Sequence, residues 1–183
     1  MGNKIIENEI GMNSRTTKRI VLTGLFFALA VLLSIVESML PPMPLPVPGV
    51  KLGLSNIAVM YALFFLSKGQ AYTIAILKAL FVFSTRGVIA GILSLNGGIL
   101  SLTVLLLLMF IFRDRISYLL LSIAGAIAHN IGQFAVISVI YSEMYFWVYI
   151  PVLIISGVAA GIVTAALLRF ILPVFKNWLE IKN

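Results

Sequence analysis

The first apolar run of the chain, Ile20–Leu40, most constrains what this sequence can fold into. It has about 21 residues and a single charge, Glu37, and as a helix rising about 1.5 Å per residue it would be roughly 31 Å long. That length matches the hydrocarbon core of a bilayer, which about 20 apolar residues cross once. The run is too long for the apolar part of a signal peptide. It therefore predicts an uncleaved transmembrane helix.

Further apolar segments follow with little polar sequence between them. Hydrophobic residues make up 61% of the 183 residues and charged residues 10%, whereas soluble domains carry about a quarter charged residues. At about 20 residues per crossing, six crossings would place roughly 120 residues in lipid. We expect helices at Ile20–Leu40, Leu52–Leu66, Ala71 to Phe83 or onward through Arg86 toward Leu95, Ile99–Phe112, Ile116–Tyr141 and Phe146–Leu172.

The sequence thus predicts an all-α integral membrane protein, a compact six-transmembrane-helix bundle. The bundle would form one domain, 20–172, between cytoplasmic tails at 1–19 and 173–183. Five prolines between Pro41 and Pro48 predict a stiff, non-helical loop after the first helix. The paired glycines of Asn96-Gly97-Gly98 predict a break between the third and fourth helices.

The distribution of Lys and Arg predicts the orientation, because segments rich in these residues tend to stay in the cytoplasm. With the N-terminus inside, the outer segments hold only Lys51 and Arg86. The inner segments hold the basic residues Lys4, Arg15, Lys18, Arg19, Lys68, Arg113, Arg115, Arg169, Lys176 and Lys182. We therefore expect a multi-pass protein of the cell membrane with both termini in the cytoplasm.

Several function classes are disfavoured by what the sequence lacks. The basic residues stand at the ends of apolar runs and form no basic face for nucleic acid. There is no Cys, and His129 is the only His, which makes a poor metal site. Asp114 is the only Asp, whereas prenyl diphosphate synthases hold Mg²⁺ with clustered aspartates. No phosphate-binding G-x-x-x-x-G-K-[ST] loop occurs. We expect no cofactor and no catalytic centre.

Three ionisable groups lie within the predicted membrane helices, where charge is costly and usually faces a protein interior. They are Glu37, Lys78 and His129. Glu37 could instead lie in the membrane interface, one turn from the end of its helix. Lys78 could extend toward the interface, or pair with Glu37 only to hold two helices together. Functional and structural interpretations both remain open here.

The segment around His129 is more informative. His129 and Gln133 are four residues apart and share a helix face, while Asn130 is offset by about 100°. Gly125 and Gly132 flank them and allow a neighbouring helix to come close. The three polar side chains predict either the wall of a polar pocket or a hydrogen-bonded clamp between helices.

Two further patterns bear on binding. Lys51, Lys78 and Arg86 would lie toward the outer half, where a positive cavity attracts an anionic ligand, although solvated loop charges would look the same. Gly24 and Ala28, four residues apart, fit a small-residue packing face on the first helix.

Four stretches in order resemble the Gx transporter family, which is also described as heptaprenyl diphosphate synthase component I. The resemblance extends over roughly 20–170, and the four stretches together are far more specific than any one of them. They are Ser34-Ile35-Val36-Glu37-Ser38, Pro48-Gly49-Val50-Lys51-Leu52-Gly53-Leu54-Ser55-Asn56, Ser94-Leu95-Asn96-Gly97-Gly98-Ile99-Leu100-Ser101 and Ala128-His129-Asn130-Ile131-Gly132-Gln133.

That family is similar to the S components of energy-coupling factor (ECF) transporters, which are six-helix membrane proteins that bind a vitamin or related molecule. The resemblance implies a ligand site beneath the loop after the first helix, and separate partners: a coupling protein and two ATPases. It also implies that Gly24 and Ala28 face the coupling protein, although the family pattern has Ala where this chain has Gly24.

The leading hypothesis is therefore a substrate-binding membrane subunit that takes up a small anionic organic molecule, such as a vitamin or quinone precursor. Its expected ligand residues are Glu37, Lys51, Asn56, Lys78, Arg86, His129, Asn130 and Gln133. The alternative is a non-catalytic accessory subunit in prenyl or quinone biosynthesis. A structural scaffold without a ligand is the third interpretation.

Overall fold

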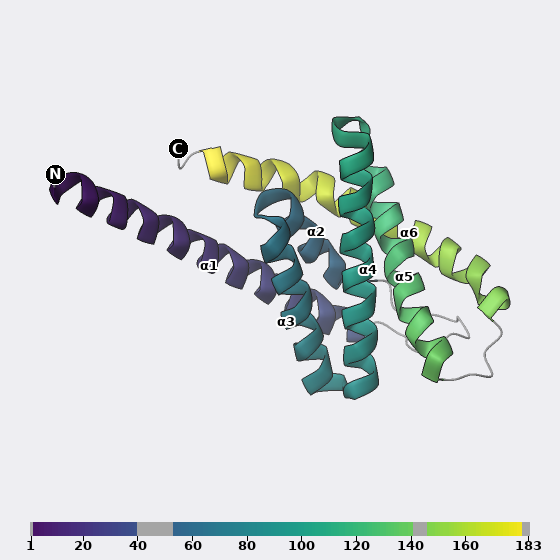
Figure 1. Cartoon of the computed structure of the whole chain (residues 1–183). Helices are drawn as coiled ribbons and strands as arrows, with labels where there is room; N and C mark the ends of the chain where they lie inside the picture. The colour runs from purple at the N-terminus through teal and green to yellow at the C-terminus, as the bar shows by residue number, and fades with distance from the viewer. Residues whose placement is uncertain (1, 40–52, 141–145, 181–183) are drawn as a thin grey trace.

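The computed structural model of the chain describes residues 2–39, 53–140 and 146–180. Within these ranges the chain is all-helical, which confirms the predicted class of secondary structure (Figure 1). The elements are α1 (Gly2–Met39), α2 (Ser55–Phe65), α3 (Lys68–Arg86), α4 (Val88–Phe112), a short 3-10 turn (Arg113–Arg115), α5 (Tyr118–Ile140) and α6 (Phe146–Glu180).

Four segments of the described chain are long and apolar enough to cross a membrane. They are Thr16–Met39, Val88–Phe112, Tyr118–Ile140 and Tyr149–Phe170. The helix α2 is apolar but has only 11 residues, which is about half of what a crossing requires. The protein is therefore a helical membrane protein, and the crossing of the bilayer by all six helices stays a prediction.

The helices run alternately in opposite directions through the bundle (Figure 1). The beginning of α1, the turn between α2 and α3 and the end of α6 lie toward the upper part of the view, whereas the turn between α3 and α4 lies at its lower edge. The helix α4 packs against α3 and α5, α5 packs against α6, and α1 packs against α2 and α3.

The short helix α2 forms the centre of the apolar core. Eight of its 11 residues are buried, because it is apolar all round and its neighbours cover every face. The hydroxyl of Tyr61, which is fully buried, donates hydrogen bonds to the carbonyl oxygens of Leu167 at 3.2 Å and Leu168 at 3.3 Å on α6. These contacts hold the middle of α2 against α6.

Three helices extend further than the sequence predicted: α1, α6 and α4, which begins at Val88 instead of Ile99. The helix α1 begins at Gly2 instead of Ile20, and α6 continues to Glu180 instead of ending at Leu172. Hydrophobicity marks where lipid begins and ends, but a helix with exposed polar side chains can continue past that point. The predicted tails are therefore helical over most of their length.

The predicted break at Asn96-Gly97-Gly98 is wrong. Helix α4 runs through these residues without interruption, and the break lies at Gly87, whose φ of +90° suits glycine. Both Gly97 and Gly98 are buried. A Cβ on Gly97 would lie 2.7 Å from ring atoms of His129 and 2.9 Å from its backbone oxygen. The glycine is needed for close helix packing, and not for a turn.

Glycines also bring α5 and α6 into close contact. A Cβ added to Gly161 would lie 2.4 Å from the Cα of Ile123, and one added to Gly157 would lie 2.9 Å from the Cα of Ile127. Small residues four apart let two backbones approach in this way, which is a common source of helix association in lipid. The result is a closely packed pair, α5 and α6, in which one face of α5 is covered.

Candidate functional site

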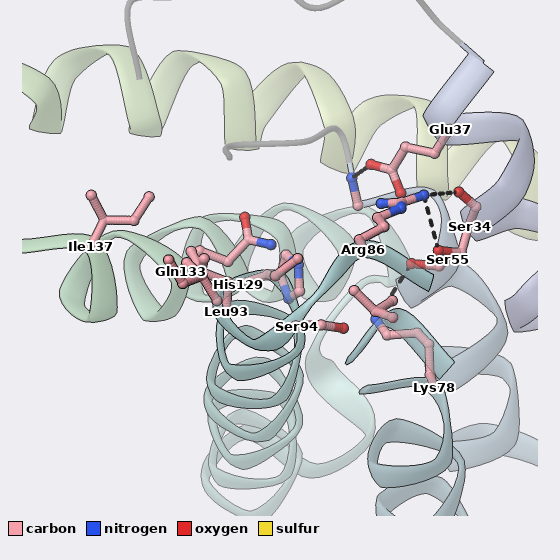
Figure 2. Close-up of a pocket in the computed structure, with 14 residues that line it drawn as sticks. Ser34, Glu37, Ser55, Lys78, Arg86, Leu93, Ser94, His129, Gln133 and Ile137 are labelled. Atoms are coloured by element: carbon pink, nitrogen blue, oxygen red, sulfur yellow. Dashed lines mark hydrogen bonds between the residues drawn. The ribbon is translucent and has the colours of Figure 1, made fainter. Parts of the chain in front are cut away.

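A cavity of about 270 Å³ lies between α1, the beginning of α2, α3, α4 and α5. It is slightly smaller than the pockets of roughly 300–1,000 Å³ that hold drug-sized ligands. Figure 2 shows its side chains. Its lining is Ser34, Glu37, Gly53, Ser55, Lys78, Val82, Arg86, Ile89, Ala90, Leu93, Ser94, His129, Gln133 and Ile137.

One end of the cavity is formed where α1 ends and α2 begins. The backbone N–H of Gly53 donates a hydrogen bond to Oε1 of Glu37, which is buried at 8% exposure. Gly53 has a φ of +75°, a conformation that glycine adopts without strain. Glu37 thus lines the cavity, as expected for a ligand residue, and its buried carboxylate also holds two segments together.

Arg86 contributes the last side chain of α3 to this end. Its Nη2 donates hydrogen bonds to the backbone oxygen of Ser34 and, at 3.5 Å, to the Ser34 hydroxyl. Ser34 and Glu37 lie on one face of α1, one turn apart, and Figure 2 shows both of them near the Arg86 guanidinium. The guanidinium is half-buried and lines the cavity, so α1 and α3 are joined around a cation and a carboxylate.

Lys78 is the most deeply buried charge of the site, with 1% exposure. Its Nζ donates hydrogen bonds to Oδ1 of Asn56 at 2.7 Å and to the hydroxyl of Ser55 at 3.3 Å. Both partners belong to the beginning of α2, whereas the sequence suggested Glu37 as a partner. Neither hydrogen-bond partner is charged, and the carboxylate that offsets the ammonium charge electrostatically is that of Glu37 in the same cavity lining.

His129 and Gln133 come from α5 and line the same cavity, one turn apart. Their exposed fractions are only 3% and 6%. Nδ1 of His129 and Oε1 of Gln133 nevertheless have no hydrogen-bond partner within the described parts of the chain. Buried polar atoms are nearly always hydrogen-bonded. Unpartnered buried atoms in a cavity wall indicate that a ligand or a water molecule occupies the position next to them.

Asn130 lies on a different side of α5. Its Nδ2 donates to the hydroxyl of Ser156 at 3.0 Å and to the backbone oxygen of Leu153 at 3.3 Å, both on α6. It is absent from the cavity lining. Of the two alternatives for this segment, Asn130 fits the clamp, whereas His129 and Gln133 fit the pocket wall.

The remaining predicted residues lie elsewhere. Asn56 borders a separate cavity of about 10 Å³, together with His129 and with Ser122, whose buried hydroxyl also lacks a partner in the described chain. Lys51 lies outside the described residues, as does the proline loop. Gly24 and Ala28 are exposed on α1 and take no part in the cavity.

Sequence reasoning did not single out Ser34, Gly53, Ser55 and Ser94 as site residues, although they line the cavity. A signal was present, because each belongs to one of the stretches that carry the family resemblance. Those stretches are separate in sequence, and each of the four contributes at least one residue to the same cavity. Spacing also pointed to Ser34, which lies one helical turn before Glu37.

The described residues contain no group of three or more His, Asp or Glu side chains that could hold a metal ion. The cavity offers cations, hydroxyls and neutral hydrogen-bonding groups instead. A buried concave site with convergent polar groups and apolar walls is typical of small-molecule binding. Fold and site thus define a helical membrane protein with an internal pocket of mixed charge.

The model of the family heptaprenyl diphosphate synthase component I matches residues 26–171. The chain belongs to this family, and the match includes all the residues that line the cavity. No curated protein and no solved structure matches the chain.

Proposed function

We propose that this protein is the substrate-binding membrane subunit of an uptake system and captures a small organic anion in the cavity. The observation that carries this proposal is the coincidence, in one cavity, of a buried lysine, a half-buried arginine and unpartnered polar atoms. Lys78 and Arg86 supply two positive charges and Glu37 supplies one negative charge. The cavity therefore has one positive charge in excess, which favours an anionic ligand.

The burial of Lys78 supports a functional explanation of its charge. A lysine that served only to join α2 and α3 could be replaced by an apolar residue at little cost to packing, since buried charges rarely contribute net stability. An ionisable residue at membrane depth that faces a cavity is a binding-site candidate by default. A ligand carboxylate or phosphate would balance the one positive charge that the described lining holds in excess, next to Lys78, whose hydrogen-bond partners are neutral.

The proposed division of labour follows the resemblance to ECF S components. The cavity lies at the end of the bundle where α1 ends, α2 begins and α3 turns into α4 (Figure 1). The distribution of Lys and Arg favours an orientation in which that end would face the outside of the cell. The exposed small residues Gly24 and Ala28 would face a coupling protein, and ATPases would supply the energy. Both termini would then be cytoplasmic.

The family description favours a second candidate, an accessory subunit of heptaprenyl diphosphate synthase. On that view a partner component performs the synthesis and this chain presents a prenyl or quinone precursor to it. A single aspartate in the chain argues against catalysis by the chain itself. Both candidate functions use the cavity, so the identity of the protein that binds this chain distinguishes them.

The test combines affinity purification from native membranes with mass spectrometry of whatever is retained. The uptake proposal predicts co-purification of a membrane coupling protein with ATPases, and a small acid bound to the wild type. The accessory proposal predicts an aspartate-rich soluble prenyltransferase instead. If Ala at both His129 and Gln133 lowers thermal stability but leaves the retained acid unchanged, the pair is a clamp and not part of a binding site.

A further inference from the structure

The two walls of the cavity differ in charge. Every charged side chain that lines it comes from α1 or α3: Glu37, Lys78 and Arg86. The opposite wall, from α4 and α5, contributes no charged side chain to the described lining. Figure 2 shows the same division, with the charged groups at one side and His129 and Gln133 at the other.

The α4–α5 wall is neutral, and its polarity decreases along α5 from His129 to Ile137. His129, Gln133 and Ile137 follow one another at intervals of four residues and therefore lie along one face. Eight residues, about 12 Å along the helix axis, separate His129 from Ile137. Leu93 and Ile89 add apolar surface from α4. This wall thus begins with hydrogen-bonding groups and ends in hydrocarbon.

The unpartnered atoms lie on this neutral wall. Nδ1 of His129 and Oε1 of Gln133 are buried without partners, and a buried polar group left unsatisfied costs about 1–3 kcal/mol. A simple anion paired with Lys78 and Arg86 would not relieve that cost. A ligand that carries a hydroxyl or amide can both donate and accept, so it can satisfy an imidazole and a carboxamide.

We propose that the ligand is a two-sided organic acid. Its acidic group faces Lys78 and Arg86, and a separate neutral hydroxyl or amide group faces His129 and Gln133. The hydrocarbon of the ligand lies against Leu93 and Ile137. This inference rests on the proposed function and narrows its ligand: inorganic anions and unsubstituted fatty acids lack the second polar group.

Two matched pairs of acids test the inference on the full chain in lipid nanodiscs. The pairs are hexanoate with 6-hydroxyhexanoate, and 3-phenylpropanoate with 3-(4-hydroxyphenyl)propanoate, and calorimetry gives each Kd. In at least one pair the hydroxylated acid is expected to bind about tenfold more tightly. The preference should disappear in Gln133→Leu. It should persist in Ser138→Ala, a control on the same helix whose hydroxyl bonds only its own helix backbone.

The outcomes separate the inference from the function on which it rests. Equal or weaker binding of the hydroxylated acid in both pairs overturns the two-sided ligand, while binding of either member leaves the organic-anion proposal standing. If none of the four acids binds at millimolar concentration, the proposed function fails together with the inference. The wild-type comparison decides these outcomes even if Gln133→Leu does not fold.

Discussion

The two sides of helix α5 are built in opposite ways. On the side toward α6, Asn130 is hydrogen-bonded to Ser156, and Gly157 and Gly161 bring the backbones into contact. On the side toward the cavity, His129 and Gln133 are equally buried but keep unpartnered atoms. Residues that are neighbours in sequence thus differ in whether the protein itself satisfies them.

This difference separates stability from function. A covered, hydrogen-bonded face is what a helix pair needs to associate in lipid, whereas unpartnered buried groups are tolerated mainly where a ligand completes them. Substitutions on the α6 side should therefore change the free energy of unfolding. Substitutions on the cavity side should change binding instead.

The largest effect is expected for Gly161→Ala. The added Cβ would lie 2.4 Å from the Cα of Ile123, so α5 and α6 must separate, at a cost of about 3 kcal/mol in unfolding free energy. Thermal unfolding in detergent measures it. The matched control is Gly24→Ala, because nothing lies within 4 Å of a Cβ at Gly24. Equal melting temperatures for the two variants would contradict the close packing.

Lys78→Met is expected to have the largest effect on binding. Loss of the buried ammonium should weaken binding of the retained acid by about 2 kcal/mol, roughly thirtyfold. Quantitative mass spectrometry of the ligand after purification measures the loss. Lys68→Met removes an exposed lysine from the same helix and should retain the wild-type amount. If both variants retain the wild-type amount of ligand, Lys78 does not contribute to binding.

Asn130→Ala and Gln133→Ala compare the two faces directly. The first removes the hydrogen bonds to α6 and should lower the unfolding free energy by about 1 kcal/mol, with binding retained. The second should weaken binding and leave the melting temperature close to that of the wild type. Thermal unfolding and calorimetry on both proteins measure the contrast. The reverse pattern would show that the two faces have been assigned wrongly.

A smaller effect is expected for Ser101→Ala on α4. Its hydroxyl donates a 2.8 Å hydrogen bond to the backbone oxygen of Gly125 on α5, away from the cavity. Loss of this bond should cost about 0.6 kcal/mol, the average for such bonds in membrane proteins. Chemical denaturation resolves this difference. Any loss of ligand binding would indicate that the α4–α5 contact also shapes the cavity.

The sequence predicted the number and order of the α-helices in the described residues because apolar runs and polar turns act locally. It failed at Asn96-Gly97-Gly98, where paired glycines usually indicate a turn. In this protein Gly97 admits the ring of His129 and the backbone of α5, and Gly98 lies against Ala75 of α3. Whether a glycine serves a turn or a close contact depends on which helix packs against it, and that information is not local.

Site residues were predictable where a charged or polar side chain is energetically costly inside a membrane helix. Charges and polar groups in apolar helices led to Glu37, Lys78, His129 and Gln133, and the structure brings all four to one cavity. Asn130 met the same criterion but is directed toward α6, because a rotation of about 100° between consecutive residues separates the two faces. Serine is common in membrane helices, so partners such as Ser55 were marked only by their place in the stretches that carry the family resemblance.

We propose that a small organic acid occupies the cavity between the charged and neutral walls. An experimental structure of the protein purified from its own membranes, at a resolution that shows ordered waters, tests for this acid. Continuous non-protein density should approach both Nζ of Lys78 and Nδ1 of His129. A cavity that contains only water, with these atoms bonded to it, would show that no acid is bound and would favour a structural scaffold.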